Sequence, residues 1–425
     1  MKPELGLRVV ANRMPVGISW LIGAAFVAMF LVRDYLMSSH GVIDHAVYWG
    51  RDFINVWTGG HLVREGRFST LYDLQAYSAY QRSLFGQIGQ HNYSYPPVSY
   101  PLAAAFSLLP YWLSLTAWLA GTGAVFVLAC QRWWPSSAGP VWLAALTPAA
   151  IVNIWAGHYG FLVGALFLFG WRSLDDNPRR AGVLFGLMLI KPHLAVLVPI
   201  VLLIRREWTA LASGAATVAA LIGGTILGFG WQPWADFVFR TSGVQTSMID
   251  AGDMFFRLMS TSTATALLQY HLGWTVAMVG QGFVALCGIG MVSLAALWRM
   301  PTRRLAFLTA TCTFLVLPYA FNYDLTVVCV GALALLYSPQ VQDDDYRLGW
   351  YGFLAPQLGM VTAAFLVFLM PVMLLGLAVA QFRCWGLRRW PRKPAGTGDI
   401  LAKLWPQQAA APTVRGAIQP VSRQG

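Results

Sequence analysis

The sequence predicts an all-α protein, a polytopic transmembrane helical bundle of about ten to twelve helices. Hydrophobic residues make up 57% of its 425 residues, charged residues only 11%, and the mean hydropathy is +0.55. A soluble domain carries about 25% charged residues. Inside a bilayer every backbone polar group must be paired internally, and the chain shows no strand-like alternation. Helices that cross the membrane are therefore the predicted structure.

The net charge of +12 indicates membrane topology rather than binding to nucleic acid. Basic residues gather in short segments between apolar runs, at 2–13, 172–180, 205–206, 299–304 and 383–393. Short loops rich in Lys and Arg stay on the cytoplasmic side, and such clusters meet anionic lipid headgroups. We therefore expect membrane lipids and no nucleic acid as partners, and the plasma (inner) membrane as the location.

Apolar runs account for most of the chain. Those that approach the about 20 residues needed to cross the hydrocarbon core are 16–35, 111–131, 139–156, 158–172, 209–230, 274–298, 304–319 and 322–337. The run 97–109 is short and bounded by prolines, so it either spans or lies at the interface. The run 349–382 contains Pro371 and is interpreted as two short spans. No small-residue cleavage site follows the first run, which predicts a retained signal-anchor helix.

The basic N-terminus places the loop 38–95 outside the cell or in the periplasm. A second outer loop, 231–273, combines aromatic residues with amphipathic stretches, so we expect interfacial helices in both loops. Residues 1–390 are predicted to form one integral-membrane domain. Residues 391–425, which contain Ala, Gln and Pro, are predicted to be a disordered basic cytoplasmic tail.

The segment 180–206 is basic at both ends and too short for two full spans. Two short helices that form an outward-pointing hairpin would keep both ends cytoplasmic and place Lys191 and His193 within the membrane. Irregular backbone at that depth is tolerated only where it lines a cavity, and an ionisable residue there is a candidate for function. The alternative is one kinked helix with a Lys that reaches to the surface.

An acidic motif follows the first apolar run. It begins at Asp52-Phe53, continues with Trp57-Thr58-Gly59-Gly60 and Leu71-Tyr72-Asp73, and leads to Tyr95-Pro96-Pro97. A carboxylate held at the membrane surface of so apolar a chain suggests chemistry on a lipid-borne substrate. The structural alternatives for Asp52 are a helix cap and an ion pair with Arg51.

Together with Gly157-His158, Lys191-Pro192-His193 and Arg205-Arg206-Glu207-Trp208, this motif makes the chain resemble glycosyltransferase family 87 of the GT-C superfamily over most of residues 45–335. The resemblance implies a GT-C-like fold, a polyprenyl-phosphate sugar as donor, commonly of mannose, and an outward-facing acceptor. It also implies that Asp52 is the general base. The chain departs from relatives at Val56, where they often have Tyr, and at His158 and His193, where they often have Gln.

The chemistry of the residues supports the same roles. A sugar hydroxyl is a poor nucleophile, and a positioned carboxylate can accept its proton during attack on the anomeric carbon. The leaving group is a lipid phosphate, which cations stabilise. Lys191 with His193 is the first choice for this role and Arg51 the second. The outer loops carry no Asp-x-Asp motif, so neither a metal nor another cofactor is expected.

Four further residues are weaker candidates for binding substrate. Asp324, in Asn322-Tyr323-Asp324, either binds the acceptor with Asn322 or caps the helix that begins there. His158 either binds the donor sugar or phosphate or is a turn residue satisfied by the backbone. Tyr95 either belongs to an aromatic platform for sugar or is part of a structured turn.

The predicted function is therefore transfer of a hexose, most often mannose in such enzymes, from a polyprenyl-phosphate donor to a lipid or polysaccharide acceptor on the outer face. Direct attack implies inversion at the anomeric carbon. The alternatives are a transporter or flippase of a lipid-linked sugar and a non-catalytic assembly subunit. A transporter would spread paired charges through two halves, whereas this chain concentrates its polar residues on one face.

Overall fold

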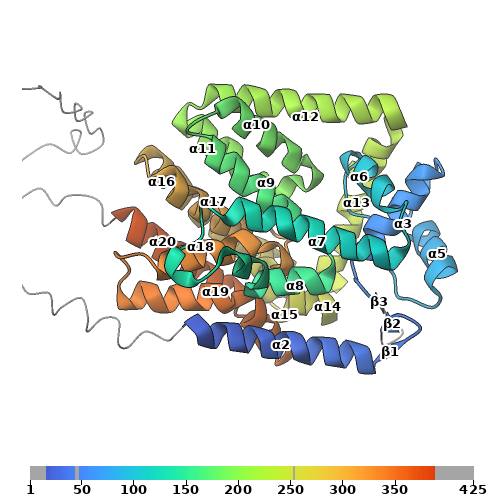
Figure 1. The fold of residues 1–425 in the computed structure, drawn as a ribbon, viewed down its shortest axis with the longest axis horizontal. Helices are drawn as coiled ribbons and strands as arrows, with labels where there is room; N and C mark the ends of the chain where they lie inside the picture. Colours follow the sequence, from blue (N-terminus) through green and yellow to red (C-terminus); the bar gives the residue numbers. More distant parts are fainter. Residues whose placement is uncertain (1–15, 44–46, 252–253, 388–425) are drawn as a thin grey trace, which may run out of the picture. The chain divides into compact units, whose positions relative to one another are not determined.

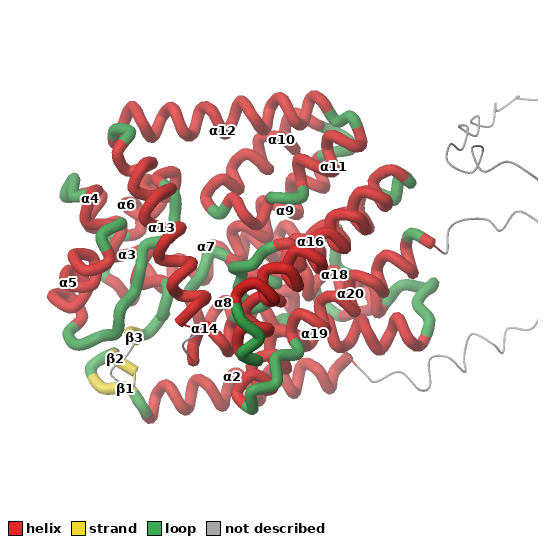
Figure 2. Tube along the Cα trace, turned by 180° about the vertical axis from the view of Figure 1, so that it is seen from behind, coloured by secondary structure: helices red, strands yellow, loops and turns green. Residues whose placement is uncertain are grey.

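The computed structural model describes residues 16–43, 47–251 and 254–387. The residues before 16 and the predicted tail 391–425 lie outside these ranges. The described part is mostly helical, with one small three-stranded sheet (Figure 1). In the view from behind, the small sheet lies near one end of α2 (Figure 2).

The first part of the chain contains α2 (Val16–Leu36), β1 (Ser38–Ser39), β2 (Val42–Ile43), β3 (Val47–Tyr48), α3 (Phe53–Arg64), α4 (Phe68–Leu71), α5 (Leu74–Phe85), η1 (Pro97–Ser99), α6 (Tyr100–Phe106), α7 (Tyr111–Cys130), η2 (Ser136–Ala138), η3 (Val141–Leu146), α8 (Pro148–Ala156) and α9 (Gly160–Ser173), where η marks a 3-10 helix. The strands are antiparallel in the order β1-β2-β3, with Ser38 opposite Ile43 and Val42 opposite Tyr48.

The second part contains α10 (Pro178–Leu187), η4 (Met188–Ile190), η5 (Pro192–Ala195), α11 (Val198–Arg205), α12 (Trp208–Phe229), α13 (Gln232–Ala251), α14 (Met254–Met259), α15 (Thr263–Gln269), α16 (Trp274–Leu297), α17 (Thr302–Val316), η6 (Asn322–Asp324), α18 (Thr326–Leu336), α19 (Asp343–Ala364) and α20 (Met370–Trp385). The two expected outer loops thus carry helices, α3 to α5 in one and α13 to α15 in the other.

Within the described residues, three helices are long and apolar enough to cross a membrane, namely α7, α12 and α16. Exposed tryptophans flank two of them: Trp208 begins α12 and Trp231 follows its end, while Trp274 begins α16 and Trp298 follows its end. Tryptophan gathers at membrane–water interfaces, so these pairs mark the levels at which both helices leave the hydrocarbon core. Four shorter apolar segments accompany them, at 160–173, 192–205, 326–336 and 370–385.

The all-α fold class is confirmed, but two boundaries differ from expectation. The prediction of one helix over 139–156 is wrong, because η3 ends before Thr147 and α8 starts at Pro148. Proline disfavours a helical conformation in the preceding residue. The run 349–382 does divide in two, but its break lies at 365–369, because Pro371 sits in the first turn of α20, where proline is tolerated.

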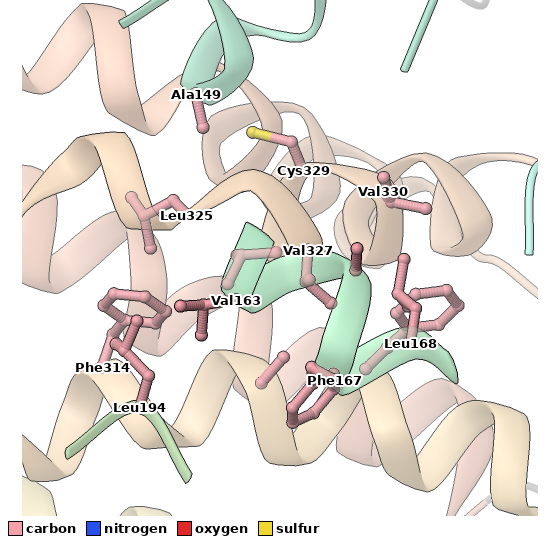
Figure 3. Packing of buried hydrophobic residues seen from close by; sticks show 14 of the residues in the cluster. Ala149, Val163, Phe167, Leu168, Leu194, Phe314, Leu325, Val327, Cys329 and Val330 are labelled. Carbon is pink, nitrogen blue, oxygen red and sulfur yellow. The ribbon is translucent and has the colours of Figure 1, made fainter. Parts of the chain in front are cut away.

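The core lies where α9, α17 and α18 meet. Val163, Phe167 and Leu168 of α9 approach Val327 and Val330 of α18 (Figure 3). α18 is buried on nearly every side, from Thr326 to Leu336. A helix that is apolar all round belongs in the interior of a large protein, so these helices form the framework from which the polar residues at their ends are presented.

Helix α3 is fixed to this framework through α6. A Cβ atom at Gly60 would overlap the Ala103 carbonyl, and one at Gly59 would overlap the ring of Tyr93. Trp57 donates to the Leu109 carbonyl at 2.9 Å and thereby ties α3 to the start of α7. The Trp-x-Gly-Gly motif therefore lets α3 approach α6 closely. This contact fixes the position of the N-terminal residues of α3 relative to α6 and α7.

Candidate active site

Asp52 lies in the turn that leads into α3. Its backbone N–H donates to the Ala156 carbonyl at the end of α8, at 2.9 Å. Gly157, with φ of 65°, has no room for a side chain, because a Cβ atom there would lie 2.7 Å from the Cβ of Phe53 and would overlap the Gly50 carbonyl. The Asp52 turn and the end of α8 are therefore in direct backbone contact.

Neither structural alternative for Asp52 is realised. Asp52 occupies the N-cap position of α3, yet its side chain accepts no capping hydrogen bond. Arg51 pairs instead with Asp34 of α2, at 2.7 Å, and stacks over Trp155 at 3.7 Å from the ring centroid. Trp155 also donates its indole N–H to Asp34, at 2.7 Å. Arg51, Asp34 and Trp155 form a clamp that joins the Asp52 turn to α2 and α8.

The turn between α8 and α9 carries His158. Asn153 holds this turn from both sides: its side-chain oxygen accepts from the Gly160 N–H at 2.9 Å, and its carbonyl accepts from the His158 N–H at 3.3 Å. The His158 ring stacks on Tyr323, with centroids 4.1 Å apart. Its Nε2 is 3.0 Å from the Tyr95 hydroxyl. Both nitrogens of the His158 ring thus have side-chain partners rather than backbone partners.

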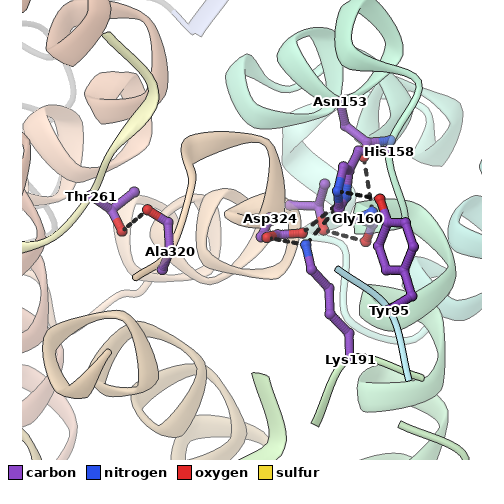
Figure 4. Close-up of polar contacts among 9 residues, drawn as sticks. Tyr95, Asn153, His158, Gly160, Lys191, Thr261, Ala320 and Asp324 are labelled. Carbon is purple, nitrogen blue, oxygen red and sulfur yellow. Dashed lines mark hydrogen bonds and ion pairs between the residues drawn. The ribbon is translucent and has the colours of Figure 1, made fainter. Parts of the chain in front are cut away.

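Lys191 interrupts the segment between α10 and α11. Its conformation is not helical, with φ of −146° and ψ of 70°, and the proline that follows disfavours a helical conformation here. This break turns the Lys191 ammonium toward a buried network, in which Nζ lies 2.5 Å from Asp324 and 3.2 Å from His158 Nδ1 (Figure 4). The segment 180–206 is therefore not one continuous helix, because it is broken at Lys191 into α10 with η4 on one side and η5 with α11 on the other.

These residues surround a cavity of about 290 Å³. Its lining is Asp52, Asn55, Asn92, Ser94, Tyr95, Pro96, His158, Ile190, Lys191, Pro192, His193, Phe237, Gln245, Phe256, Tyr319, Phe321 and Tyr323. The cavity joins the Asp52 turn to the break between α10 and α11 at Lys191 and His193. Both polar and aromatic side chains face it, a combination that suits a sugar, whose rings have apolar faces and polar edges.

The Asp52 carboxyl is half-buried at this cavity. Loss of water contact raises its pKa to about 6, whereas the positive charges of Lys191 and Arg51 oppose the rise. The negative charge of Asp324 acts in the same direction as burial. A carboxylate with a pKa near neutrality is better matched to accepting a proton at physiological pH than an ordinary one.

The residues singled out in the sequence divide into two groups. Asp52, Tyr95, His158, Lys191 and His193 line one cavity, although they come from four separate segments of the chain. Asp324 does not line it but pairs with Lys191.

The side chains of Arg51 and Asn322 are engaged elsewhere. Arg51 belongs to the clamp, and Asn322 donates to the Pro356 carbonyl at 3.0 Å. Neither side chain lines the cavity.

Sequence reasoning missed the polar residues Asn55, Asn92, Ser94 and Gln245. It also missed most of the aromatic wall, which consists of the cavity-lining residues Tyr95, Phe237, Phe256, Tyr319, Phe321 and Tyr323. Asn55 follows Asp52 by three residues, a spacing that places two side chains on the same helix face, so it could have been found. Gln245 and Phe256 carry no such signal, because long-range folding alone brings α13 and α14 to the cavity. Among the described residues, no three His, Cys, Asp or Glu side chains gather as metal ligands would.

The model of glycosyltransferase family 87 matches residues 93–318, which is more than half of the chain. The chain belongs to glycosyltransferase family 87. No curated protein and no solved structure matches it. Within the matched range lie Tyr95, His158, Lys191 and His193, whereas Asp52 precedes it and Asp324 follows it.

Membership makes the protein a membrane glycosyltransferase, as expected from the sequence, which takes a sugar from a donor to a glycan or lipid acceptor. Its cavity draws on the matched part of the chain and on residues that precede and follow it.

Proposed function

We propose that this glycosyltransferase moves a hexose, with mannose as the first candidate, from a polyprenyl-phosphate donor to a hydroxyl group of a lipid or polysaccharide acceptor on the outer face of the membrane. The observation that carries the proposal is the placement of Asp52. It is a carboxylate without a capping or ion-pair role, it has a pKa of about 6, and it lies in a cavity that also contains Lys191 and His193.

In the proposed reaction, Asp52 accepts the proton of the acceptor hydroxyl as its oxygen attacks the anomeric carbon. The new bond to that oxygen forms while the bond from the anomeric carbon to the phosphate oxygen breaks. The electron pair leaves with the polyprenyl phosphate, and direct attack inverts the configuration at the anomeric carbon.

Lys191 and His193 would bind the phosphate. An ammonium has three N–H bonds, and Lys191 uses two of them on Asp324 and His158. One remains for a ligand oxygen. Asp324 would keep Lys191 charged in its buried position, because an opposite charge offsets the cost of burial. The aromatic wall would hold the sugar rings.

The test is to incubate the purified protein with a panel of polyprenyl-phosphate sugars and an acceptor mixture from membrane glycolipids, and to measure release of polyprenyl phosphate. Release with one sugar and not with others supports the proposal and identifies the donor. Absence of release from every member, together with movement of the intact lipid-linked sugar across vesicles, would indicate a flippase instead.

A further inference from the structure

Asn55 has a fixed orientation at the cavity. It lies in the first turn of α3, three residues after Asp52, and it is 95% buried, with a relative exposure of 5%. Its side-chain oxygen accepts two hydrogen bonds, from the Tyr77 hydroxyl at 3.1 Å and from Gln81 Nε2 at 3.2 Å. An amide oxygen has two lone pairs, so this oxygen is saturated from the side of α5.

The other end of the same amide is free for a ligand. Among the described residues Asn55 Nδ2 has no hydrogen-bond partner, and Asn55 lines the cavity beside Asp52. Tyr77 and Gln81 are fully buried, and their hydrogen bonds to the Asn55 oxygen join α5 to α3. The cavity therefore has an acceptor at Asp52 and a donor at Asn55 on one helix face.

We propose that Asp52 and Asn55 together bind two neighbouring hydroxyl groups of a saccharide acceptor, with Asp52 on the nucleophilic hydroxyl and Asn55 donating to the oxygen next to it. This rests on the proposed function and names its acceptor as a vicinal diol, rather than an isolated hydroxyl such as that of a lipid alcohol.

Chemistry determines which oxygen Asn55 contacts. A hydrogen bond donated to the attacking oxygen would withdraw electron density from the lone pair that forms the new bond. The ionised Asp52 can only accept, and Asn55 Nδ2 can only donate. The pair therefore suits two oxygens of one sugar ring, one that loses a proton and one that does not.

The experiment combines protein variants with modified acceptors. The probes are the octyl glycosides of mannose, glucose and galactose, and then each monodeoxy analogue of the best of them, with the donor found in the panel assay. For the wild type, one deoxy position next to the attacking hydroxyl should lower kcat/KM for the acceptor about 3- to 10-fold, the scale of one net hydrogen bond. Asn55→Ala should lose a similar factor with the parent acceptor and nothing further with that deoxy analogue, which is the signature of coupling in a double-mutant cycle.

Asn55→Asp separates binding from folding. It keeps the oxygen that Tyr77 and Gln81 contact but replaces the donor with an acceptor, so it should lose the same coupling. A second carboxylate beside Asp52 also favours protonation of Asp52, so the acid limb of the pH profile should move to higher pH. Thr58→Val is the matched control, because Thr58 is a buried residue on the next turn of α3 whose hydroxyl is unpaired within the described structure. It should leave kcat/KM and the pH profile unchanged.

The outcomes distinguish the two proposals. No polyprenyl phosphate released from any donor would remove the proposed function. Release in the panel assay, but with no octyl glycoside as acceptor, would overturn the diol alone. So would an Asn55→Asp enzyme with wild-type kcat/KM, or equal losses from every deoxy position in the wild type and in Asn55→Ala.

Discussion

Asp52 is placed among charges that oppose one another. Burial and Asp324 favour its neutral form, whereas Lys191 and Arg51 favour the carboxylate. The resulting pKa of about 6 leaves the Asp52 carboxyl mostly ionised at pH 7, but only about one pH unit above its midpoint. Proton acceptance by this residue should therefore respond to modest acidification.

The pH dependence of kcat/KM should show this directly. A base must be deprotonated to act, so activity should be near its full value above pH 7 and should fall tenfold for each unit below a midpoint of about 6. The measurement is initial rate against pH between 4.5 and 8 with the donor fixed. An acid limb near pH 4 would mean that the carboxyl is not desolvated.

Replacement of the carboxylate should abolish most turnover. Asp52→Asn keeps the shape but cannot take a proton, so the rate should fall by at least about 10²-fold, the scale of general base catalysis. Donor binding should persist, because Lys191 and His193 are unchanged. The measurement is single-turnover release of polyprenyl phosphate alongside donor affinity.

Asp73→Asn is the matched control. Asp73 is the N-cap of α5 and accepts from the Gln75 and Ala76 N–H groups, at 3.1 and 3.0 Å. Asn caps helices about as well as Asp, so this variant should retain activity. Full activity of Asp52→Asn together with loss in Asp73→Asn would show that the wrong carboxylate has been chosen.

Lys191 requires a paired substitution. Lys191→Met alone leaves Asp324 buried without its counter-ion, and breaking such a pair costs about 3–5 kcal/mol. The double variant Lys191→Met with Asp324→Asn removes both charges, so it should remain folded yet bind the donor at least about tenfold more weakly, because one charge-assisted hydrogen bond to phosphate is lost. Donor affinity is measured on the purified protein, with Asp324→Asn alone as the control. Unchanged affinity in the double variant would exclude Lys191 from the phosphate site.

At the scale of the element, the close approach of α3 and α6 determines where Asp52 lies. Gly60→Ala should lower the thermal unfolding temperature, because overpacking costs about 1–3 kcal/mol and the better helix propensity of Ala returns only about 1. Gly121→Ala in α7 is the control, since a Cβ atom there meets nothing within 4 Å. Thermal unfolding of the detergent-purified variants is the measurement. A Gly60→Ala protein as stable as Gly121→Ala would mean that the two helices can separate at no cost.

Individual elements also show which parts of the fold and of the candidate site could be predicted from the sequence. Apolar length predicts α7, α12 and α16 because a span needs little beyond hydrophobic residues. The motif residues Asp52, His158 and Lys191 could be chosen because charged groups are rare in such a chain. The ion-pair partner of Arg51 could not be predicted from the sequence. Asp34 lies 17 residues away in an apolar helix, and only the folded clamp brings the two side chains together. The same holds for Gln245 and Phe256, which no local pattern places at the cavity.

At the scale of the whole molecule, the basic segments still predict the orientation in the membrane. Ser69→Cys, at an exposed position within α4, should label from outside with an impermeant thiol reagent, and Ser173→Cys only from inside. Both are introduced into Cys287→Ser, because Cys287 is the half-exposed native thiol among the described residues. Labelling of both positions from outside would contradict this predicted topology.

The clamp of Asp34, Arg51 and Trp155 has a consequence for the lipid around the protein. Asp34 is part of α2, whose neighbouring side chains at Met29, Val32 and Tyr35 are exposed. A helix that faces lipid adjusts its tilt when the hydrocarbon layer becomes thicker or thinner. Through Asp34 such a tilt acts on Arg51 and hence on the adjoining Asp52. We therefore expect the depth of the Asp52 carboxylate to follow bilayer thickness, so that the rate of the proposed reaction should change with the acyl-chain length of the surrounding lipid.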